Sequence, residues 1–209
     1  QYVSALDVAP GDAVEEAVKR CWASWFGDGP LAYRRRGFRR PPAAGMAVIV
    51  QELVDARTAG VLFTINPLTG SWREMVIEAA HGQGEAVVSG RVAPDRYLLR
   101  RPRRTPRPVQ RVLARVRVEE LKAEVSEQTR SLRPTGSGLA WIGEEGASGR
   151  KLTVAEVLRL GRLGLRSESL CGGPQDMEWA ISGRGEIFVL QSRVVTVRGG
   201  NDRPRETLW

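Results

Sequence analysis

The run DMEWAI at residues 176–181, followed by SGRGE and then IFVLQSR at residues 187–193, constrains the fold more than any other stretch of this chain. Two strand-like runs joined by a short glycine-containing turn are typical of a β-hairpin. Side chains alternate between the two faces of a strand, so Asp176 and Glu178 share one face and the apolar residues beside them share the other. The hairpin therefore requires an antiparallel sheet with one apolar face and one face that carries carboxylates.

Three further runs rich in Val, Ile and Phe indicate strands at residues 46–53, 60–66 and 74–80. The connections between them are short and contain turn residues, among them the pair Asn66-Pro67. Parallel strands need crossovers of a dozen residues or so, whereas antiparallel strands do not. These runs therefore favour antiparallel pairing over a doubly wound parallel sheet.

Helices are indicated where an N-cap residue with Glu three positions later precedes apolar residues at helical spacing. Asp12 begins one such segment, predicted as a helix over residues 12–26, and Thr153 begins a second, predicted over about 154–169. A third, more polar helix is predicted over about 118–132. Antiparallel sheets with flanking helices place the chain in the α+β class.

The length and composition are those of globular material, because 42% of the 209 residues are hydrophobic and recur in periodic runs. The longest apolar runs, such as 46–50, are far shorter than the roughly 20 residues of a membrane span. Cys21 and Cys171 lack metal-ligand spacing, which favours a reducing, cytoplasmic setting. The chain begins at Gln1 without a leader-like segment, and we expect a fragment or a processed chain.

The net charge of +8 suggests an anionic partner, so nucleic acid has to be considered. The excess is concentrated in two proline-containing segments that we interpret as loops. Their arginines are Arg34, Arg35, Arg36, Arg39 and Arg40 in one segment, and Arg100, Arg101, Arg103, Arg104, Arg107 and Arg111 in the other. Arginine in place of lysine is also what a GC-rich coding sequence produces, and we favour that interpretation over a nucleic-acid patch.

The polar face of the hairpin has two interpretations. If the turn comprises residues 183–186, Glu178 lies opposite Gln191 and Asp176 lies opposite Arg193. Oxygen ligands suit Mg²⁺ and a guanidinium forks onto phosphate oxygens, so this set fits a metal-bound polyphosphate. The alternative is a solvated face with a cross-strand Asp–Arg pair, which contributes about 0.2–1 kcal/mol. The residues of the hairpin alone do not decide between the two.

Several blocks of the chain together resemble the nucleotide-binding domain of phosphoenolpyruvate synthases (pyruvate, water dikinases), pyruvate phosphate dikinases and rifampicin phosphotransferases. QDMEWAI and VLQSR resemble the closing motif of that domain. MAVIVQELVDARTAGVLFTINPLTG and VIEAAHGQGEAVVSGRVAPDRY resemble two further blocks, and KRCWASWFGDGPLAYRRR resembles the helix that precedes them. The blocks follow the order of the family and cover nearly all of residues 1–198.

The resemblance implies an α+β, ATP-grasp-like fold, in which two lobes of antiparallel sheet and helices hold ATP between them. Residues 1–45 then correspond to the tail of an N-terminal lobe with a helix and a basic loop. Residues 46–198 correspond to the C-terminal nucleotide-binding lobe, and residues 199–209 to a linker or tail. The N-terminal lobe is expected to be incomplete, since no lysine of this chain stands in the family's ATP-contacting motif.

The resemblance also implies the cofactors ATP and Mg²⁺ and a set of site residues. Glu178 and Gln191 match the Mg²⁺-ATP ligands, and Arg193 matches a phosphate-contacting arginine with a catalytic role. Asp176 completes the acidic motif, and Gln51 matches a position that lines the nucleotide pocket.

The implied activity is the transfer of phosphate from ATP to a histidine on a separate domain. His81 is the one histidine of this chain, and we interpret it as structural rather than as the phosphate carrier. The phosphohistidine and substrate domains are expected to lie outside this chain. Two alternatives remain: the ATP-binding domain of a rifampicin phosphotransferase, and a noncatalytic remnant that binds protein or nucleic acid through its arginine loops.

Three smaller features belong to the same region of the sequence. The GQGE segment at residues 82–85 lacks the spacing of a phosphate-binding P-loop and is more typical of a turn. Asn66 precedes a proline, and we favour turn chemistry for it over a contact with phosphate. Glu78 lies within an apolar strand run and is a candidate polar residue of the pocket.

Overall fold

The computed structural model describes residues 3–28, 46–101, 118–143 and 149–195. The chain divides into two compact units, one of residues 1–53 with 134–140, and the other of residues 54–133 with 141–209. Among the described helices, none has the combination of length and hydrophobicity needed to cross a lipid bilayer.

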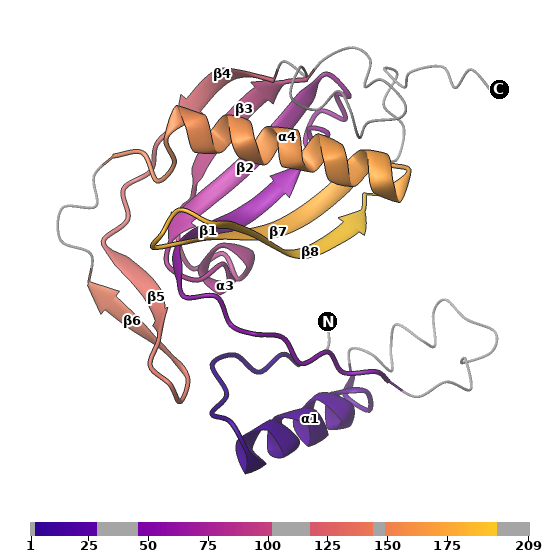
Figure 1. The fold of residues 1–209 in the computed structure, drawn as a ribbon, viewed down its shortest axis with the longest axis vertical. Coiled ribbons are helices and arrows are strands. Elements are labelled where there is room, and N and C mark those ends of the chain that lie inside the picture. The colour runs from indigo at the N-terminus through magenta and orange to yellow at the C-terminus, as the bar shows by residue number, and fades with distance from the viewer. Residues whose placement is uncertain (1–2, 29–45, 102–117, 144–148, 196–209) are drawn as a thin grey trace. The chain divides into compact units, whose positions relative to one another are not determined.

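The larger unit is built on a six-stranded sheet with the strand order β4-β3-β2-β1-β7-β8 (Figure 1). Every neighbouring pair in it is antiparallel, as the short connections predicted. The strands are β1 Ala56–Phe63, β2 Glu74–His81, β3 Asp95–Arg100, β4 Glu119–Glu124, β7 Gln175–Ser182 and β8 Ile187–Val194. A separate two-stranded sheet pairs β5 Arg130–Pro134 with β6 Leu139–Gly143.

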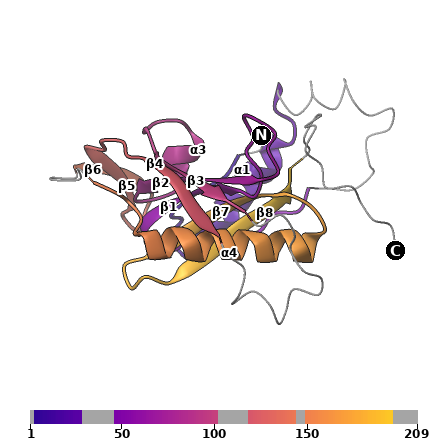
Figure 2. The ribbon, with the colours of Figure 1, turned by 90° about the horizontal axis from the view of Figure 1, so that it is seen from above.

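One face of the six-stranded sheet is covered by α4, Val154–Cys171, and the short helix α3, Glu85–Val88, lies on the other side (Figure 2). The predicted start of α4 is confirmed, because the Thr153 hydroxyl accepts from the Glu156 amide and the Glu156 carboxylate accepts from the Thr153 amide. The helix ends at Gly172, whose φ of 76° is left-handed.

The main core lies between α4 and the sheet. It contains Leu62, Met75, Ile77, Tyr97, Leu99, Leu152, Val157, Leu160, Leu165, Met177, Trp179 and Ile181, all at most 1% exposed. Two glycines let the helix approach the strands closely. A Cβ added at Gly164 would lie 2.6 Å from Leu62 Cδ2, and one added at Gly161 would lie 2.8 Å from Leu99 Cδ2. The apolar side chains of β1 and β7 that contact α4 therefore occupy one face of the sheet. Because side chains alternate along a strand, the polar side chains of β7 lie on the opposite face.

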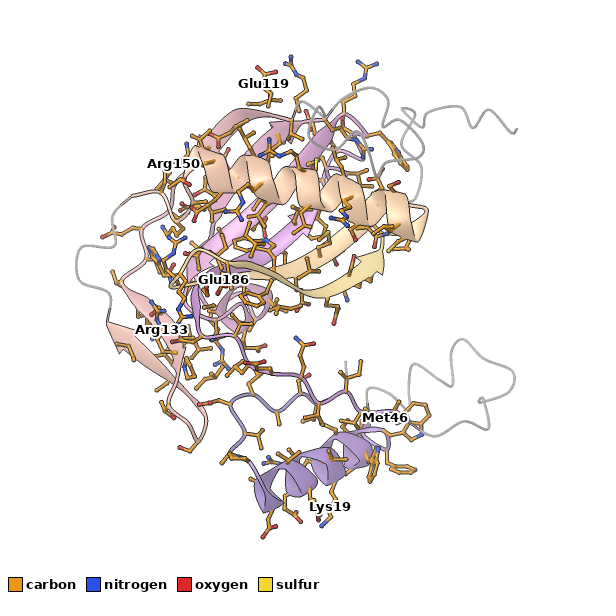
Figure 3. The ribbon with its side chains drawn as sticks, viewed as in Figure 1. Lys19, Met46, Glu119, Arg133, Arg150 and Glu186 are labelled. Carbon is orange, nitrogen blue, oxygen red and sulfur yellow. The ribbon has the colours of Figure 1, made fainter. Side chains whose placement is uncertain are left out.

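The predicted first helix is confirmed as α1, Asp12–Ser24, in the smaller unit, but the predicted cap is wrong, because the N-cap is Gly11 and no side chain caps the helix. The predicted strand over residues 46–53 is wrong: this segment has no regular secondary structure, and no described strand pairs with it. Ile49 is 86% exposed and Val50 is 70% exposed. Met46 lies beside α1 (Figure 3). Trp22 of α1 holds the segment there, because its Nε1 donates to the Met46 carbonyl at 3.0 Å. An apolar run needs a partner strand to become a strand, and the described residues provide none here.

The helix predicted over residues 118–132 is also wrong, since the chain forms β4 and β5 there. The sequence VEELKAE contains good helix formers, but β3 offers an edge on which it pairs. Tyr97 pairs with Ala123, and Arg100 lies opposite Glu119 with a charge separation of 3.8 Å. Tertiary pairing therefore overrides the local helical preference.

Candidate functional site

The candidate site lies on the face of the six-stranded sheet opposite α4, which we call the open face. As predicted, Asp176 pairs with Arg193 and Glu178 pairs with Gln191 across β7 and β8. Residues that pair directly in an antiparallel sheet carry their side chains on the same face. The two carboxylates, the amide and the guanidinium therefore lie together on the open face.

The register nearer the turn differs from the prediction. Ile181 rather than Ser182 pairs with Ile187, and a bulge between Glu178 and Trp179 shifts the pairing before the polar residues are reached. One residue of β8 in this bulge is Leu190, which has no direct partner on β7. The pairing implied by a turn over residues 183–186 is therefore wrong by one residue near the turn but right at the site.

Asp176 and Arg193 form an ion pair. Arg193 donates through Nε and approaches through Nη2, each 2.7 Å from Asp176 Oδ2. The Asp176 side chain is 12% exposed and the Arg193 side chain 64% exposed. Because Arg193 Nη1 has no hydrogen bond to a described residue, this arginine is oriented by Asp176 and still presents donors to solvent.

Glu178 and Gln191 are unlike this pair. Neither side chain has a hydrogen bond or ion pair with another described residue. Partial burial raises the pKa of Glu178, and the carboxylates of Asp176 and Glu85 raise it further, against the opposing effect of Arg193. A nearby cation would stabilise the ionised form of this carboxylate, so the electrostatics of this position favour binding a positive charge.

The donor set fits Mg²⁺. Glu178 and Gln191 offer two oxygen ligands side by side, and Mg²⁺ usually takes one or two carboxylates together with water and phosphate oxygens. In the described part of the chain, no three His, Cys, Asp or Glu side chains gather closely enough to hold a metal by themselves. This position therefore suits a metal that arrives with a phosphate ligand rather than a closed protein site.

Ser192 anchors the strand between the two site residues of β8. Its hydroxyl donates to Gln175 Oε1 at 2.8 Å and lies 2.9 Å from the Ser167 hydroxyl of α4. The backbone N–H of Gln175 in turn donates to Thr64 Oγ1 at 2.9 Å. Sequence reasoning missed this anchor, because the serines are far apart in the chain and carry no motif.

Glu85 was also missed as a neighbour of the site. It is the first residue of α3 and raises the pKa of Glu178. A Cβ at the preceding Gly84 would lie 3.6 Å from Ala59 Cβ, so this segment crosses the open face over β1. Ala59 pairs with Ala180, two residues along β7 from Glu178.

The rest of the GQGE segment is a structural turn. The Gly82 N–H donates to the Arg57 carbonyl at 3.0 Å, and the Gln83 N–H donates to the Leu132 carbonyl at 2.9 Å. Gly82 has a φ of 81°, and an added Cβ would lie 2.5 Å from the Leu132 oxygen. The turn chemistry predicted for Asn66 is also present, since its side-chain oxygen accepts from the Leu68 amide at 3.0 Å.

Glu78 and Gln51 lie apart from the hairpin. Glu78 and Glu178 pair with opposite sides of Val61, so two strand spacings, about 10 Å, separate their backbones. Glu78 is therefore on the open face but is not a neighbour of Glu178. Gln51 is exposed and belongs to the smaller unit, and its role at the pocket stays a prediction.

The structure describes two arginines of the basic segments, of which Arg100 is 63% exposed and lies 3.8 Å from Glu119, whereas Arg101 is buried. Arg101 is 8% exposed, donates to the Thr64 carbonyl at 2.7 Å and forms an ion pair with Glu168 at 2.6 Å. The arginines of residues 34–40 and 103–111 lie outside the described residues.

His81, the one histidine of the chain, is held through its backbone. The side-chain oxygen of Gln128 accepts from the His81 N–H at 2.9 Å.

Comparison with known proteins gives this site a context. The family model described as "Pyruvate phosphate dikinase, AMP/ATP-binding domain" matches residues 1–207. The probable phosphoenolpyruvate synthase of Archaeoglobus fulgidus is 36% identical over 197 residues, which are 94% of this chain and 24% of that protein.

Two further relatives show similar coverage. The phosphoenolpyruvate synthase of Pyrococcus furiosus is 33% identical over 199 residues, 94% of this chain and 24% of that protein. The rifampicin phosphotransferase of Streptomyces sviceus is 32% identical over 196 residues, 94% of this chain and 21% of that protein. The chain thus spans about a quarter or less of the length of these relatives. With its mostly antiparallel α+β, ATP-grasp-like fold, the chain belongs to the family of pyruvate phosphate dikinase AMP/ATP-binding domains.

Proposed function

We propose that this chain is the Mg²⁺-ATP-binding part of a phosphoenolpyruvate synthase-like dikinase, in which phosphate passes from ATP to a histidine on a separate domain. The observation that carries the proposal is the pairing of Glu178 with Gln191 beside the Asp176–Arg193 ion pair. Membership of an ATP-binding domain family supports the nucleotide, and the oxygen donors support the metal.

Each of these residues has one role in the proposal. Glu178 and Gln191 would hold Mg²⁺, which would neutralise phosphate charge when bound. Arg193 contacts phosphate through donors that Asp176 leaves free, and it acts catalytically by stabilising charge on the transferred group. Asp176 orients the guanidinium, while Ser192 holds the intervening backbone against α4. Positioning and electrostatics provide most of the catalysis of phosphoryl transfer, so a fixed hairpin suits this reaction.

The remaining parts of the proposal concern organisation. Residues 1–45 form the tail of an N-terminal lobe, residues 46–198 form the nucleotide-binding lobe, and residues 199–209 form a linker or tail. Gln51 lines the nucleotide pocket. A rifamycin is the rival final acceptor, because a rifampicin phosphotransferase is similar over the same 94% of the chain. Domains outside this chain decide between the two acceptors.

Calorimetric titration of Mg²⁺-ATP tests the proposed site. We expect binding to require Mg²⁺ and to weaken by roughly 10- to 100-fold in Glu178→Gln and Arg193→Ala, since each removes a charge-assisted contact of about 1.5–3 kcal/mol. Arg184→Ala is the matched control, because Arg184 is exposed at the hairpin turn and away from the site. Equal affinities in wild type and both site variants would exclude these residues. Binding that persists in EDTA would exclude the metal.

A further inference from the structure

A closed ring of hydrogen-bonded residues lies within the larger unit, behind the candidate site. In order around the ring, its members are Glu168, Arg101, Thr64, Gln175, Ser192 and Ser167. The ring closes because Ser167 and Glu168 are consecutive residues of α4. It includes Gln175, the residue of the QDMEWAI motif that directly precedes Asp176.

One half of the ring joins the ends of three strands. Arg101, which follows β3, donates to the Glu168 carboxylate at 2.6 and 3.0 Å and to the Thr64 carbonyl at 2.7 Å. Thr64, which follows β1, donates its backbone N–H to the Gln175 carbonyl, and its Oγ1 accepts from the Gln175 N–H, each at 2.9 Å. Thr64, Arg101 and Gln175 are buried. Buried networks whose polar groups are satisfied are rigid, so the ends of β1, β3 and β7 are fixed to one another.

The side chain of Gln175 extends the ring to β8. Its Oε1 accepts from the Ser192 hydroxyl at 2.8 Å, and its Nε2 donates to the Gly173 carbonyl at 2.7 Å. Because Ser192 has a single hydroxyl hydrogen and gives it to Gln175, the Ser167 hydroxyl is the donor in its 2.9 Å contact with Ser192. The Gln175 amide is therefore held in one orientation.

This contact reaches β8 from the side opposite the candidate site. Ser192 lies between Gln191 and Arg193, and side chains alternate along a strand, so Ser192 lies on the α4 side while its two neighbours lie on the open face. In the described sheet β8 is an edge strand that pairs only with β7. The bonds of Ser192 to Gln175 and Ser167 therefore add to β8 a constraint that the edge of the sheet does not provide.

We propose that Gln175 is a positioning residue of the candidate site, which holds Gln191 and Arg193 in place through Ser192 and does not itself contact the ligand. This inference rests on the proposed function, because it takes from there the roles of Gln191 and Arg193. With the ring closed, the donors of Arg193 are already oriented when phosphate arrives. With the ring broken, Arg193 keeps its partner Asp176, but β8 loses its tie to α4 and has to be ordered on binding, which lowers affinity.

Variants of Ser192 test the tie at an exposed position, where the core is not disturbed. We expect Ser192→Ala to weaken Mg²⁺-ATP binding roughly 10-fold in calorimetric titration of the full chain, as when a group that orients a metal ligand is removed. Ser192→Thr keeps the hydroxyl and should bind as wild type does. Gln175→Met, which retains a similar volume, should lose at least as much affinity as Ser192→Ala.

Thr58→Val is the matched control for Gln175→Met. Thr58 is also 0% exposed, and its Oγ1 donates to the Lys151 carbonyl at 3.4 Å, outside the ring. Its replacement removes a buried hydrogen bond of β1 but leaves Ser192 tied to Gln175, so Mg²⁺-ATP affinity should stay at the wild-type value.

Hydrogen exchange at the Arg193 Nε–H gives a second readout that needs no nucleotide. This N–H donates to Asp176 Oδ2 at 2.7 Å, and its NMR signal is assigned by its loss in Arg193→Ala. We expect its exchange to be about threefold faster or more in Ser192→Ala and Gln175→Met, because a less constrained β8 opens this bond more often. Ser192→Thr and Thr58→Val should exchange as wild type does.

The two readouts separate this inference from the proposed function. If Arg193→Ala binds Mg²⁺-ATP as wild type does, the proposed function is wrong, and unchanged exchange at the Arg193 Nε–H in Ser192→Ala would then overturn the positioning role. If Arg193→Ala weakens binding while Ser192→Ala and Gln175→Met bind normally, only the positioning role is overturned. An equal loss of affinity in Thr58→Val would overturn it as well, because the effect would then follow from reduced stability.

Discussion

Replacing Lys151 by methionine should lower the free energy of unfolding by about 3–5 kcal/mol, because removing one partner of a buried ion pair leaves the other charge uncompensated. Lys151 Nζ lies 2.8 Å from Asp95 Oδ1, and both side chains are 0% exposed. Lys151 Nζ also donates to the Ser126 carbonyl. Methionine fills a similar volume, so the expected loss comes from charge and hydrogen bonding rather than from a cavity.

The carboxylate that would be left behind connects three parts of the larger unit. Asp95 begins β3 and accepts from the Ser126 amide at 2.8 Å, the Lys151 amide at 2.9 Å and the Tyr97 hydroxyl at 2.7 Å. Tyr97 O in turn accepts from the Leu152 amide at 3.1 Å, just before α4. The ion pair therefore fixes the approach of α4 to the sheet, on the face opposite the candidate site.

Urea denaturation of the full chain measures this effect. Lys122→Met is the matched control, since Lys122 pairs with Glu124 at 2.6 Å but is 65% exposed. Exposed pairs contribute about 0–1 kcal/mol, so the control should stay within that range. A loss below about 1 kcal/mol in Lys151→Met would contradict the assigned burial of the pair.

The same pair predicts how stability responds to acid. Burial acts to raise the pKa of Asp95, but Lys151 and the backbone amides lower it, and the net result is a pKa below its usual value. A carboxylate with a depressed folded pKa contributes stability above its unfolded pKa of about 3.9 and loses it as the pH falls through the folded pKa. On acidification from about pH 5, Asp95→Asn should therefore lose less stability than wild type. Parallel pH profiles in urea denaturation would contradict this.

The parts of the fold that local sequence determines were predictable. The start of α4 follows from the capping box at Thr153, and the polar face of the hairpin follows from strand alternation through Asp176 and Glu178. The bulge beside Glu178 was not predictable, because its position depends on how β8 packs rather than on a turn residue. The predicted pairs Glu178–Gln191 and Asp176–Arg193 are nevertheless correct, because the one-residue bulge compensates for the one-residue error in the pairing next to the turn.

The parts that depend on distant partners were missed. The residues over 118–132 prefer a helix locally, and only the edge of β3 makes part of them a strand. The run over 46–53 is apolar enough for a strand but has no described partner. Lys151 and Asp95 are 56 positions apart in the sequence, and neither belongs to a motif of charged residues. Burial and pairing of this kind are properties of the packed chain and leave little local signal.

The second large effect is expected at Gly60, in the middle of β1. A Cβ added there would lie 1.9 Å from the Glu78 carbonyl oxygen and 2.9 Å from its carbon. The obstructing atoms are backbone atoms of the neighbouring strand, so no rotamer change relieves the clash. Either β1 or β2 has to move, and both are central strands of the six-stranded sheet.

Gly60→Ala should therefore lower the free energy of unfolding by about 3 kcal/mol, at the upper end of the cost of overpacking. Gly143→Ala is the matched control, because Gly143 also lies in a strand but an added Cβ meets no atom of a described residue within 4 Å. That variant should be neutral or more stable by about 0.4–1 kcal/mol, since alanine restricts the unfolded chain. Urea denaturation compares the two, and equal stabilities would contradict the close approach of the strands.

Gly60→Ala should also weaken Mg²⁺-ATP binding in the calorimetric titration. Val61, the next residue, pairs with Glu78 on one side and with Glu178 on the other, so a displaced β1 would shift Glu178.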